Sequence, residues 1–429
     1  MAAFHDGTYF LLGEQYGSAE RCFRAVTREF PACHEAWANL GYALLMRYCD
    51  GLEVDDLRRF DLGQLAVGGF YRRPGTLEAQ VRGIDEELWW DAVGALREAL
   101  RLKPDSVVIK ANLGVAYLVR PAGRDVGQAA RYLEEAAEAV ESDPANAGLN
   151  DLDKVDLRAA VLLNAGVADL AGGRSDVSAR RLDRVAALVA QLSGDRPERP
   201  RASGLAAALH YNRALLLAAA PEAEKRRAAV GQFERYLRSA SPASAWWPLA
   251  YERYAKLCRE LHLEAKSEKE LKDRIQTDLR PLTAVRLRSG AQVTLSEPTG
   301  EVTDRLGGGQ AVPVVPGTNL RRLSYPDQGI DLLVTDRVLA IRLRGPGAPT
   351  LPLRSTGLGT TATELRVGMA KRELDQLLKD LDSSPGGLDD PKVRYQFYPK
   401  LGLAVQVQVQ SGRVEELVVV RVPRSESAM

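Results

Sequence analysis

The sequence has 429 residues, and its 58 lysines and arginines almost balance its 57 aspartates and glutamates. At this length more than one hydrophobic core is expected, so we predict a multidomain protein. A net charge of +1 argues against a nucleic-acid partner, since proteins that bind nucleic acid carry an excess of positive charge. No stretch approaches the roughly 20 apolar residues of a membrane helix, and the first residues do not resemble a signal peptide. We therefore expect a cytoplasmic protein without membrane insertion.

Two helical segments in the first part of the chain share the same core. Residues 34–44 and 107–117 both contain Ala-Asn-Leu-Gly, with apolar or small residues three and four positions apart on one helical face. Each is preceded by a second helix, in which a small, an apolar and a small or branched residue are followed by a proline that ends the helix. The matching positions are Ala19, Phe23, Val26 and Pro31, and again Ala92, Leu96, Ala99 and Pro104.

These positions resemble the tetratricopeptide repeat family, in which helix A carries the first pattern and helix B the second. The resemblance implies an all-α superhelix of about five helical pairs over residues 1–265. Weaker copies follow after residue 129, and the proline- and arginine-rich stretch 194–204 is predicted to be a loop between pairs.

The first repeat is interrupted by an insertion, residues 47–88, where a short turn is expected. A connection this long usually has a function or is disordered. Its aromatic and arginine side chains, flanked by glycines, are interpreted as an arm across the mouth of the superhelix: Phe70, Tyr71, Arg72 and Arg73. Alternatively, residues 55–66 form a helix that belongs to an inserted pair.

An asparagine occupies the equivalent place in four A helices: Asn39, Asn112, Asn164 and Asn212. The resemblance implies that these helices line a concave groove, where such an asparagine holds a peptide. Tyr42, Lys110 and Arg213 lie nearby on the same helices and would complete the site. Alternatively, each asparagine bonds to a neighbouring loop and fixes the geometry between repeats.

Residues 266–283 are predicted to form a connecting helix and linker that ends near Pro281. Over 284–424 the sequence alternates apolar and polar residues in short runs, which indicates a smaller α+β domain with an antiparallel sheet. A helix is expected at 365–381 and a hairpin turn at 411–412, while 425–429 form a tail.

The helix opening at 367–373 and the Gly-Arg-Val at 412–414 resemble the outer-membrane assembly lipoprotein BamE and β-lactamase-inhibitor-like domains. A degenerate earlier copy over 285–343 predicts a duplicated domain, with Tyr325 matching Tyr395 and Gly329 matching Gly402.

The sequence offers no residues that we would assign to catalysis, a metal or a cofactor. His34-Glu35 begins a zinc-protease pattern, but position 38 is alanine, so the second ligand is missing. The glycine-rich stretch 306–310 lacks phosphate-loop spacing. Four cysteines without a CxxC pair are expected to be free, buried thiols: Cys22, Cys33, Cys49 and Cys258.

We therefore predict a non-enzymatic scaffold that binds a protein or peptide partner in the repeat groove, with an oligomeric state that the sequence leaves open. The alternative is the non-catalytic, repeat-containing region of a larger bacterial metallopeptidase. A hydrolase hidden in the second domain is a third hypothesis.

Overall fold

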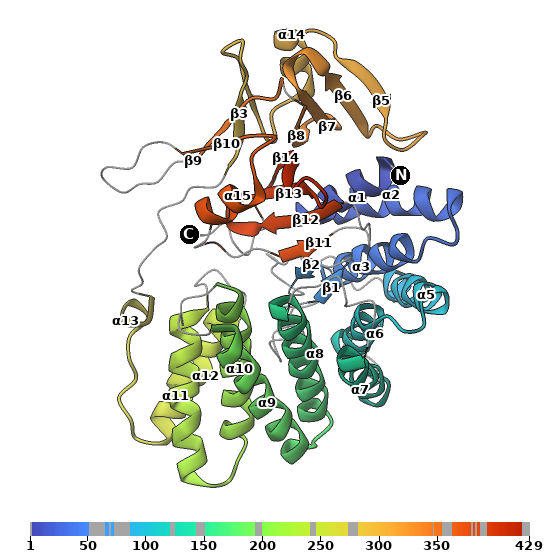
Figure 1. Ribbon diagram of the computed structural model, residues 1–429. Coiled ribbons are helices and arrows are strands. Elements are labelled where there is room, and N and C mark those ends of the chain that lie inside the picture. Colours follow the sequence, from blue (N-terminus) through green and yellow to red (C-terminus); the bar gives the residue numbers. More distant parts are fainter. Residues whose placement is uncertain are drawn as a thin grey trace. The chain divides into compact units, whose positions relative to one another are not determined.

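The computed structural model describes residues 2–50, 65–67, 70–72, 86–120, 125–142, 151–193, 200–240, 246–272, 282–345, 347–353, 363–378, 381, 384–386 and 393–422. The chain forms two compact units. We call Met1–Ala43, Gly68–Phe70 and Gln276–Ser427 the sheet unit, and Leu44–Val67, Tyr71–Ile275 and Ala428–Met429 the helical unit. The predicted fold class is confirmed: a helical-repeat region is combined with an α+β region built on an antiparallel sheet (Figure 1).

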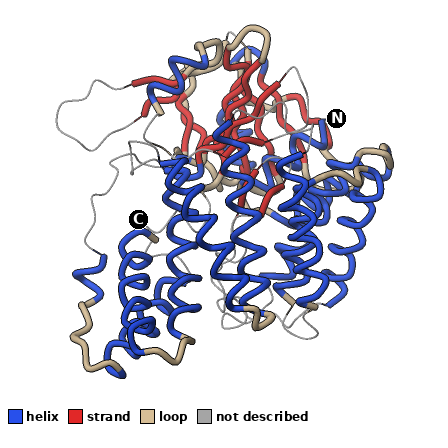
Figure 2. Tube along the Cα trace, turned by 60° about the horizontal axis from the view of Figure 1, so that its bottom comes forward, coloured by secondary structure: helices blue, strands red, loops and turns tan. Residues whose placement is uncertain are grey.

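The helical unit is a series of helices in which consecutive members pack on one another, except that the last and shortest packs on the helix two places before it (Figures 1 and 2). These helices are α5 (Glu86–Leu102), α6 (Val107–Val119), α7 (Val126–Ser142), α8 (Asp151–Ala171), α9 (Ser175–Ser193), α10 (Pro200–Ala218), α11 (Ala223–Ser239), α12 (Trp246–Glu260) and α13 (Glu268–Lys272). The strands β1 (Leu65–Val67) and β2 (Phe70–Arg72) form a small two-stranded sheet. None of the described helices is long and apolar enough to cross a membrane.

The glycine shared by the two Ala-Asn-Leu-Gly copies has a packing role in α6. A Cβ added to Gly114 would lie 2.5 Å from Leu133 Cγ and 3.1 Å from the Ala129 carbonyl oxygen, both on α7. Gly166 of α8 faces Leu182 of α9 in the same way, at 3.2 Å. The glycine of the repeat pattern therefore indicates where the two helices of a pair are in contact.

The sheet unit contains three helices from the start of the chain, the last of which continues into the helical unit. They are α1 (Ala2–Leu12), α2 (Tyr16–Glu29) and α3 (His34–Asp50). The rest of this unit consists of β3 (Ala284–Arg286), β4 (Gln292–Thr294), α14 (Thr299–Leu306), β5 (Gln310–Pro313), β6 (Arg321–Tyr325), η2 (Pro326–Gln328), β7 (Ile330–Val334), β8 (Val338–Arg344), β9 (Leu351–Leu353), β10 (Thr363–Leu365), α15 (Lys371–Leu377), β11 (Ser384–Gly386), β12 (Val393–Tyr398), η3 (Pro399–Leu401), β13 (Leu403–Gln408) and β14 (Arg413–Val420).

Eight strands form one antiparallel sheet in the order β11-β12-β13-β14-β8-β7-β6-β5. Alternate residues of its central strands, such as Leu332, Ile341, Val405 and Leu417, belong to one buried hydrophobic core. The residues between them point to the opposite face, as the two-residue period of a strand requires. That opposite face carries several charged residues.

The two halves of the sheet unit repeat the same elements in the same order. The first is β3, β4, α14, β6, β7 and β8, and the second is β9, β10, α15, β12, β13 and β14. Their backbone hydrogen bonds match as well: Val338 N–H donates to the Glu297 carbonyl at 2.9 Å, and Val414 N–H donates to the Met369 carbonyl at 2.9 Å. The halves meet where β8 pairs with β14, and the corresponding residues Arg342 and Val418 are direct partners there. The unit therefore has an approximate two-fold arrangement.

One detail of the predicted duplication is wrong. The counterpart of Tyr325 is Tyr398, not Tyr395, because each of these two tyrosines precedes a short 3-10 turn and a left-handed glycine, Gly329 or Gly402. The resemblance to BamE stays a prediction.

Other boundaries also differ from those predicted. The sequence assigns residues 1–265 to one helical domain, whereas Met1–Ala43 group with the sheet, because α1 carries polar side chains whose partners lie on the strands. The helix expected at 365–381 starts only at Lys371, since Gly368 has a left-handed backbone (φ 87°) that interrupts any helix before it. Of the connecting helix, α13 covers Glu268–Lys272, and residues 273–281 lie outside the described residues.

Candidate functional site

The four equivalent asparagines are buried in the structure. Asn39 and Asn164 are 3% and 2% exposed, and Asn112 and Asn212 are fully buried. Asn212 donates from Nδ2 to the Ala208 carbonyl of its own helix at 2.9 Å. A ligand can therefore reach one of these side chains only if it displaces the part of the protein that buries it.

The side of α6 that carries Asn112 faces neither α5 nor α7. Gly114 faces α7, and Ala116 faces α5, where Trp89 Nε1 donates to its carbonyl at 2.9 Å. An α-helix has 3.6 residues per turn, so the residues that point away from both α5 and α7 can be identified from their spacing. It carries five residues, which we call the α6 inner face: Val108, Ala111, Asn112, Val115 and Val119.

Strand β1 packs on α6, and since α5 and α7 lie on other sides of this helix, we assign β1 to the α6 inner face. Besides α5 and α7, β1 is the described element packed most closely on α6. Four residues of the face are buried and Val108 is half-buried. A stretch of extended backbone from the chain's own insertion thus lies on the helix face where the sequence predicts a bound peptide.

The other predicted groove residues are spread over both units. Asn39 and Tyr42 belong to the sheet unit, where the Tyr42 ring lies 6.5 Å from that of Tyr16. In the helical unit, Lys110 Nζ lies 3.7 Å from a Glu135 carboxylate oxygen, and Arg213 forms an ion pair with Asp183. Both cations are therefore engaged with the neighbouring B helices.

The insertion residues are only partly described. Phe70, Tyr71 and Arg72 form β2, and Arg73 lies outside the described residues. The alternative helix at 55–66 is wrong for its last two residues, because Leu65 and Ala66 belong to β1. The rest of that segment lies outside the described residues.

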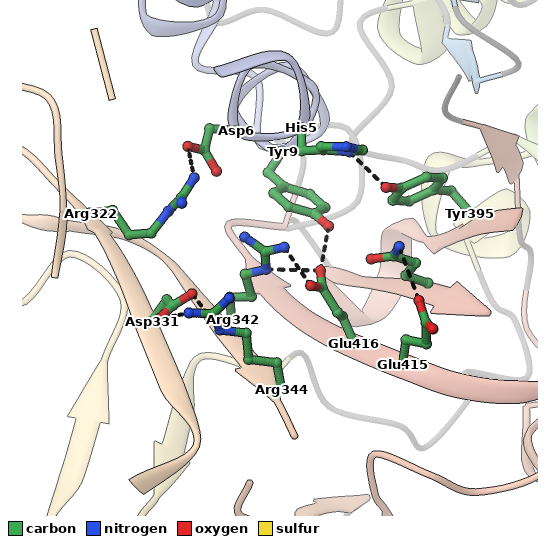
Figure 3. A network of polar contacts seen from close by, with 11 residues as sticks. His5, Asp6, Tyr9, Arg322, Asp331, Arg342, Arg344, Tyr395, Glu415 and Glu416 are labelled. Carbon is green, nitrogen blue, oxygen red and sulfur yellow. Dashed lines mark hydrogen bonds and ion pairs between the residues drawn. The ribbon is translucent and has the colours of Figure 1, made fainter. Parts of the chain in front are cut away.

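A second candidate site lies between α1 and the charged face of the sheet, wholly within the sheet unit (Figure 3). Its centre is Glu416 on β14, which accepts two hydrogen bonds from Arg342 of β8, one of them from Nε at 2.8 Å, and one from the Tyr9 hydroxyl at 3.2 Å. Arg322 of β6 forms an ion pair with Asp6. We call the full set the polar seam: His5, Asp6, Tyr9, Arg322, Asp331, Arg342, Arg344, Tyr395 and Glu416.

Two further contacts complete the polar seam. Tyr395 stacks on His5 with ring centroids 5.9 Å apart, and its hydroxyl lies 2.7 Å from His5 Nδ1. Arg344 Nε lies 2.9 Å from an Asp331 carboxylate oxygen. Asp6 is 0% exposed, while Tyr9 and Asp331 are 1% exposed, so these groups depend on one another instead of water.

Burial controls the electrostatics of the polar seam. It raises the pKa of Asp6, against the attraction of Arg322, and it lowers the pKa of His5, with help from the Arg342 charge. Burial and the Glu416 carboxylate raise the pKa of Tyr9 well above its usual value. Burial also disfavours the charge of Arg342, but Tyr9 and Glu416 outweigh it and raise its pKa.

The polar seam is suited to holding α1 in place. Its charges are matched in pairs and shielded by the helix, so the groups that would perform chemistry are already used in internal contacts. No local sequence pattern predicts this site. A signal was present, because His5, Asp6 and Tyr9 share one face of an otherwise apolar helix, but their partners are more than 300 residues away in the chain.

Among the described residues, no group of three or more His, Cys, Asp and Glu side chains could hold a metal ion. Cys22, Cys49 and Cys258 are buried as predicted, Cys33 is half-buried, and none of the four forms a disulfide.

No protein-family model matches the sequence, and no curated protein matches it. Among solved structures, the human IFIT1 dimer with m7Gppp-AAAA has 17% sequence identity and a TM-score of 0.34, covering 60% of this chain and 45% of that chain. The human IFIT1 dimer with PPP-AAAA has 17% identity and a TM-score of 0.32, covering 58% and 43%. The chain thus spans less than half the length of these IFIT1 chains. A similarity this low does not transfer a ligand or an activity from IFIT1 to this protein.

Proposed function

We propose that this protein is a non-catalytic scaffold that binds a peptide or protein partner on the inner faces of its helical pairs. The observation that carries the proposal is the placement of β1 on the α6 inner face, since it puts a segment of chain where the repeat pattern predicts a ligand. Stacked helical pairs suit this role because they offer a long surface on which modest contacts add up.

The chemistry of the α6 inner face also supports the proposal. Val108, Ala111, Val115 and Val119 are apolar and carry no charge, which suits a peptide better than a phosphate backbone. Asn112 supplies one donor group and one acceptor, the two functions that an extended backbone can use. The nearly neutral net charge of the chain agrees with a protein partner.

Photo-cross-linking of the intact chain tests the proposal. We would place benzoylphenylalanine at Val108, irradiate in a lysate of the source cells, and sequence the cross-linked peptides by mass spectrometry. One partner segment should be recovered repeatedly, and excess unlabelled protein should compete for it.

The matched control places the same group at Glu138, on the exposed side of α7. Equal capture from both positions, or no capture from position 108, would show that the inner face is not the binding surface.

A further inference from the structure

Strand β1 covers the α6 inner face with only three residues. It belongs to a two-stranded sheet, and isolated sheets of this size are at best marginally stable in water. In the sequence a glycine stands two residues before β1, and two glycines follow it directly, at positions 63, 68 and 69. The α6 inner face is thus covered by a short strand that gains little stability from its own sheet.

We propose that β1 is an internal ligand, and that the partner of the helical unit is an extended segment that replaces Leu65–Val67 on the α6 inner face with uncharged residues. This inference rests on the proposed function and names the class of segment that is bound. The apolar face with one asparagine favours a strand with small or branched apolar residues, which is the composition of β1 itself. Its own sequence therefore serves as the probe.

The internal ligand sets a threshold for partners. A segment of the same chain competes at a high effective concentration, of the order of millimolar. A partner must bind tightly enough to displace β1, so segments with weak affinity do not occupy the α6 inner face. Removing β1 should then increase the apparent affinity for a free strand by at least about tenfold, or roughly 1.4 kcal/mol.

The test uses a fluorescent peptide with the sequence of residues 61–73 and measures its binding by anisotropy. The proteins are the intact chain and a full-length variant in which residues 65–72 are replaced by eight glycines and serines. We expect the replacement variant to bind the peptide at least tenfold more tightly than the intact chain, and neither protein to bind a scrambled peptide.

Equal affinity of both proteins, or no binding to either, would overturn the inference. Circular dichroism shows whether the variant keeps its helices. If the variant loses its helices, the test is made on the intact chain instead. Excess peptide should then suppress an internal cross-link from position 108 to residues 65–67. An unchanged yield of that cross-link would contradict the exchange.

A failure of this inference can be distinguished from a failure of the proposed function. Capture of the same partner from position 108, with equal yield in the intact chain and in the replacement variant, would support the scaffold and reject β1 as an internal ligand.

Discussion

At the polar seam, helix α1 covers a sheet through buried charges, whereas at the α6 inner face a three-residue strand covers an apolar helix surface. One ion pair of the seam joins Asp6 of α1 to Arg322 of β6, and another joins Arg342 of β8 to Glu416 of β14. Separating either pair would leave charges without partners. Removing β1 from the α6 inner face would leave no unpaired charge, because no charged residue lies on that face. The comparison teaches that burial alone does not distinguish a permanent contact from an exchangeable one, and the chemistry of the buried groups does.

The largest expected effect is the loss of the central ion pair of the polar seam. Glu416→Gln leaves the Arg342 guanidinium without its carboxylate. Removing one partner of a fully buried pair costs about 3–5 kcal/mol of unfolding free energy, and since both side chains here are 12% exposed, the loss should lie at or below the lower end of that range. Urea-induced unfolding measures this loss. Arg342→Met combined with Glu416→Leu should lose much less, because no unpaired charge remains.

The control for this prediction is a pair at the surface of the helical unit. Asp183, whose side chain is 73% exposed, pairs with Arg213, so Asp183→Asn should change the unfolding free energy by at most about 1 kcal/mol. Similar losses of unfolding free energy in Glu416→Gln and Asp183→Asn would mean that the polar seam does not hold α1 in place.

A second prediction concerns the contact between α6 and α7. Gly114→Ala introduces a Cβ 2.5 Å from Leu133 Cγ, and overpacking of this kind costs about 1–3 kcal/mol. Gly94→Ala on α5 is the matched control, because nothing lies within 4 Å of its added Cβ. Since alanine is the better helix former, that control should gain about 0.5–1 kcal/mol. Thermal unfolding distinguishes the two, and a neutral Gly114→Ala would contradict the packing role.

A third prediction tests the asparagine of the α6 inner face. In the replacement variant that lacks β1, Asn112→Ala should weaken binding of the 61–73 peptide about fivefold, because a hydrogen-bonded amide contributes on the order of 1 kcal/mol. Asn212→Ala is the control of the same type, since Asn212 lies on α10 and bonds to Ala208 of its own helix. An equal loss in both variants would show that the effect is structural.

The smallest expected effect is a pH dependence that arises from His5. Burial lowers the pKa of His5 in the folded chain, so as the pH falls below about 6.5 the unfolded chain binds a proton first, and stability declines. Unfolding curves at pH 7.5 and 5.5 should therefore show a greater loss in the unmodified chain than in His5→Gln. A loss of the same size in both would place the pH dependence elsewhere.

The helical pairs could be predicted because their information is local. The Ala-Asn-Leu-Gly core and its prolines specify helix ends and the close approach at Gly114 within a few residues. The hairpin around residues 411–412 was predictable for the same reason, since β13 and β14 alternate apolar and polar residues.

The site was harder to predict because its contacts are not local. Glu416, Arg342 and Tyr9 meet only after the sheet has formed and α1 has docked on it, and no short pattern encodes that pairing. The burial of the asparagines is not encoded locally either. On α6 the repeat pattern indicates which side Asn112 faces, but not that strand β1 of the insertion covers that side.

The most direct test of the central claim is an internal cross-link in the intact protein. Benzoylphenylalanine at Val108 should react with residues 65–67, and a saturating amount of the 61–73 peptide should replace that product with a cross-link to the peptide. Cross-links from position 108 that never include residues 65–67, with or without the peptide, would contradict the claim that the α6 inner face binds an extended segment.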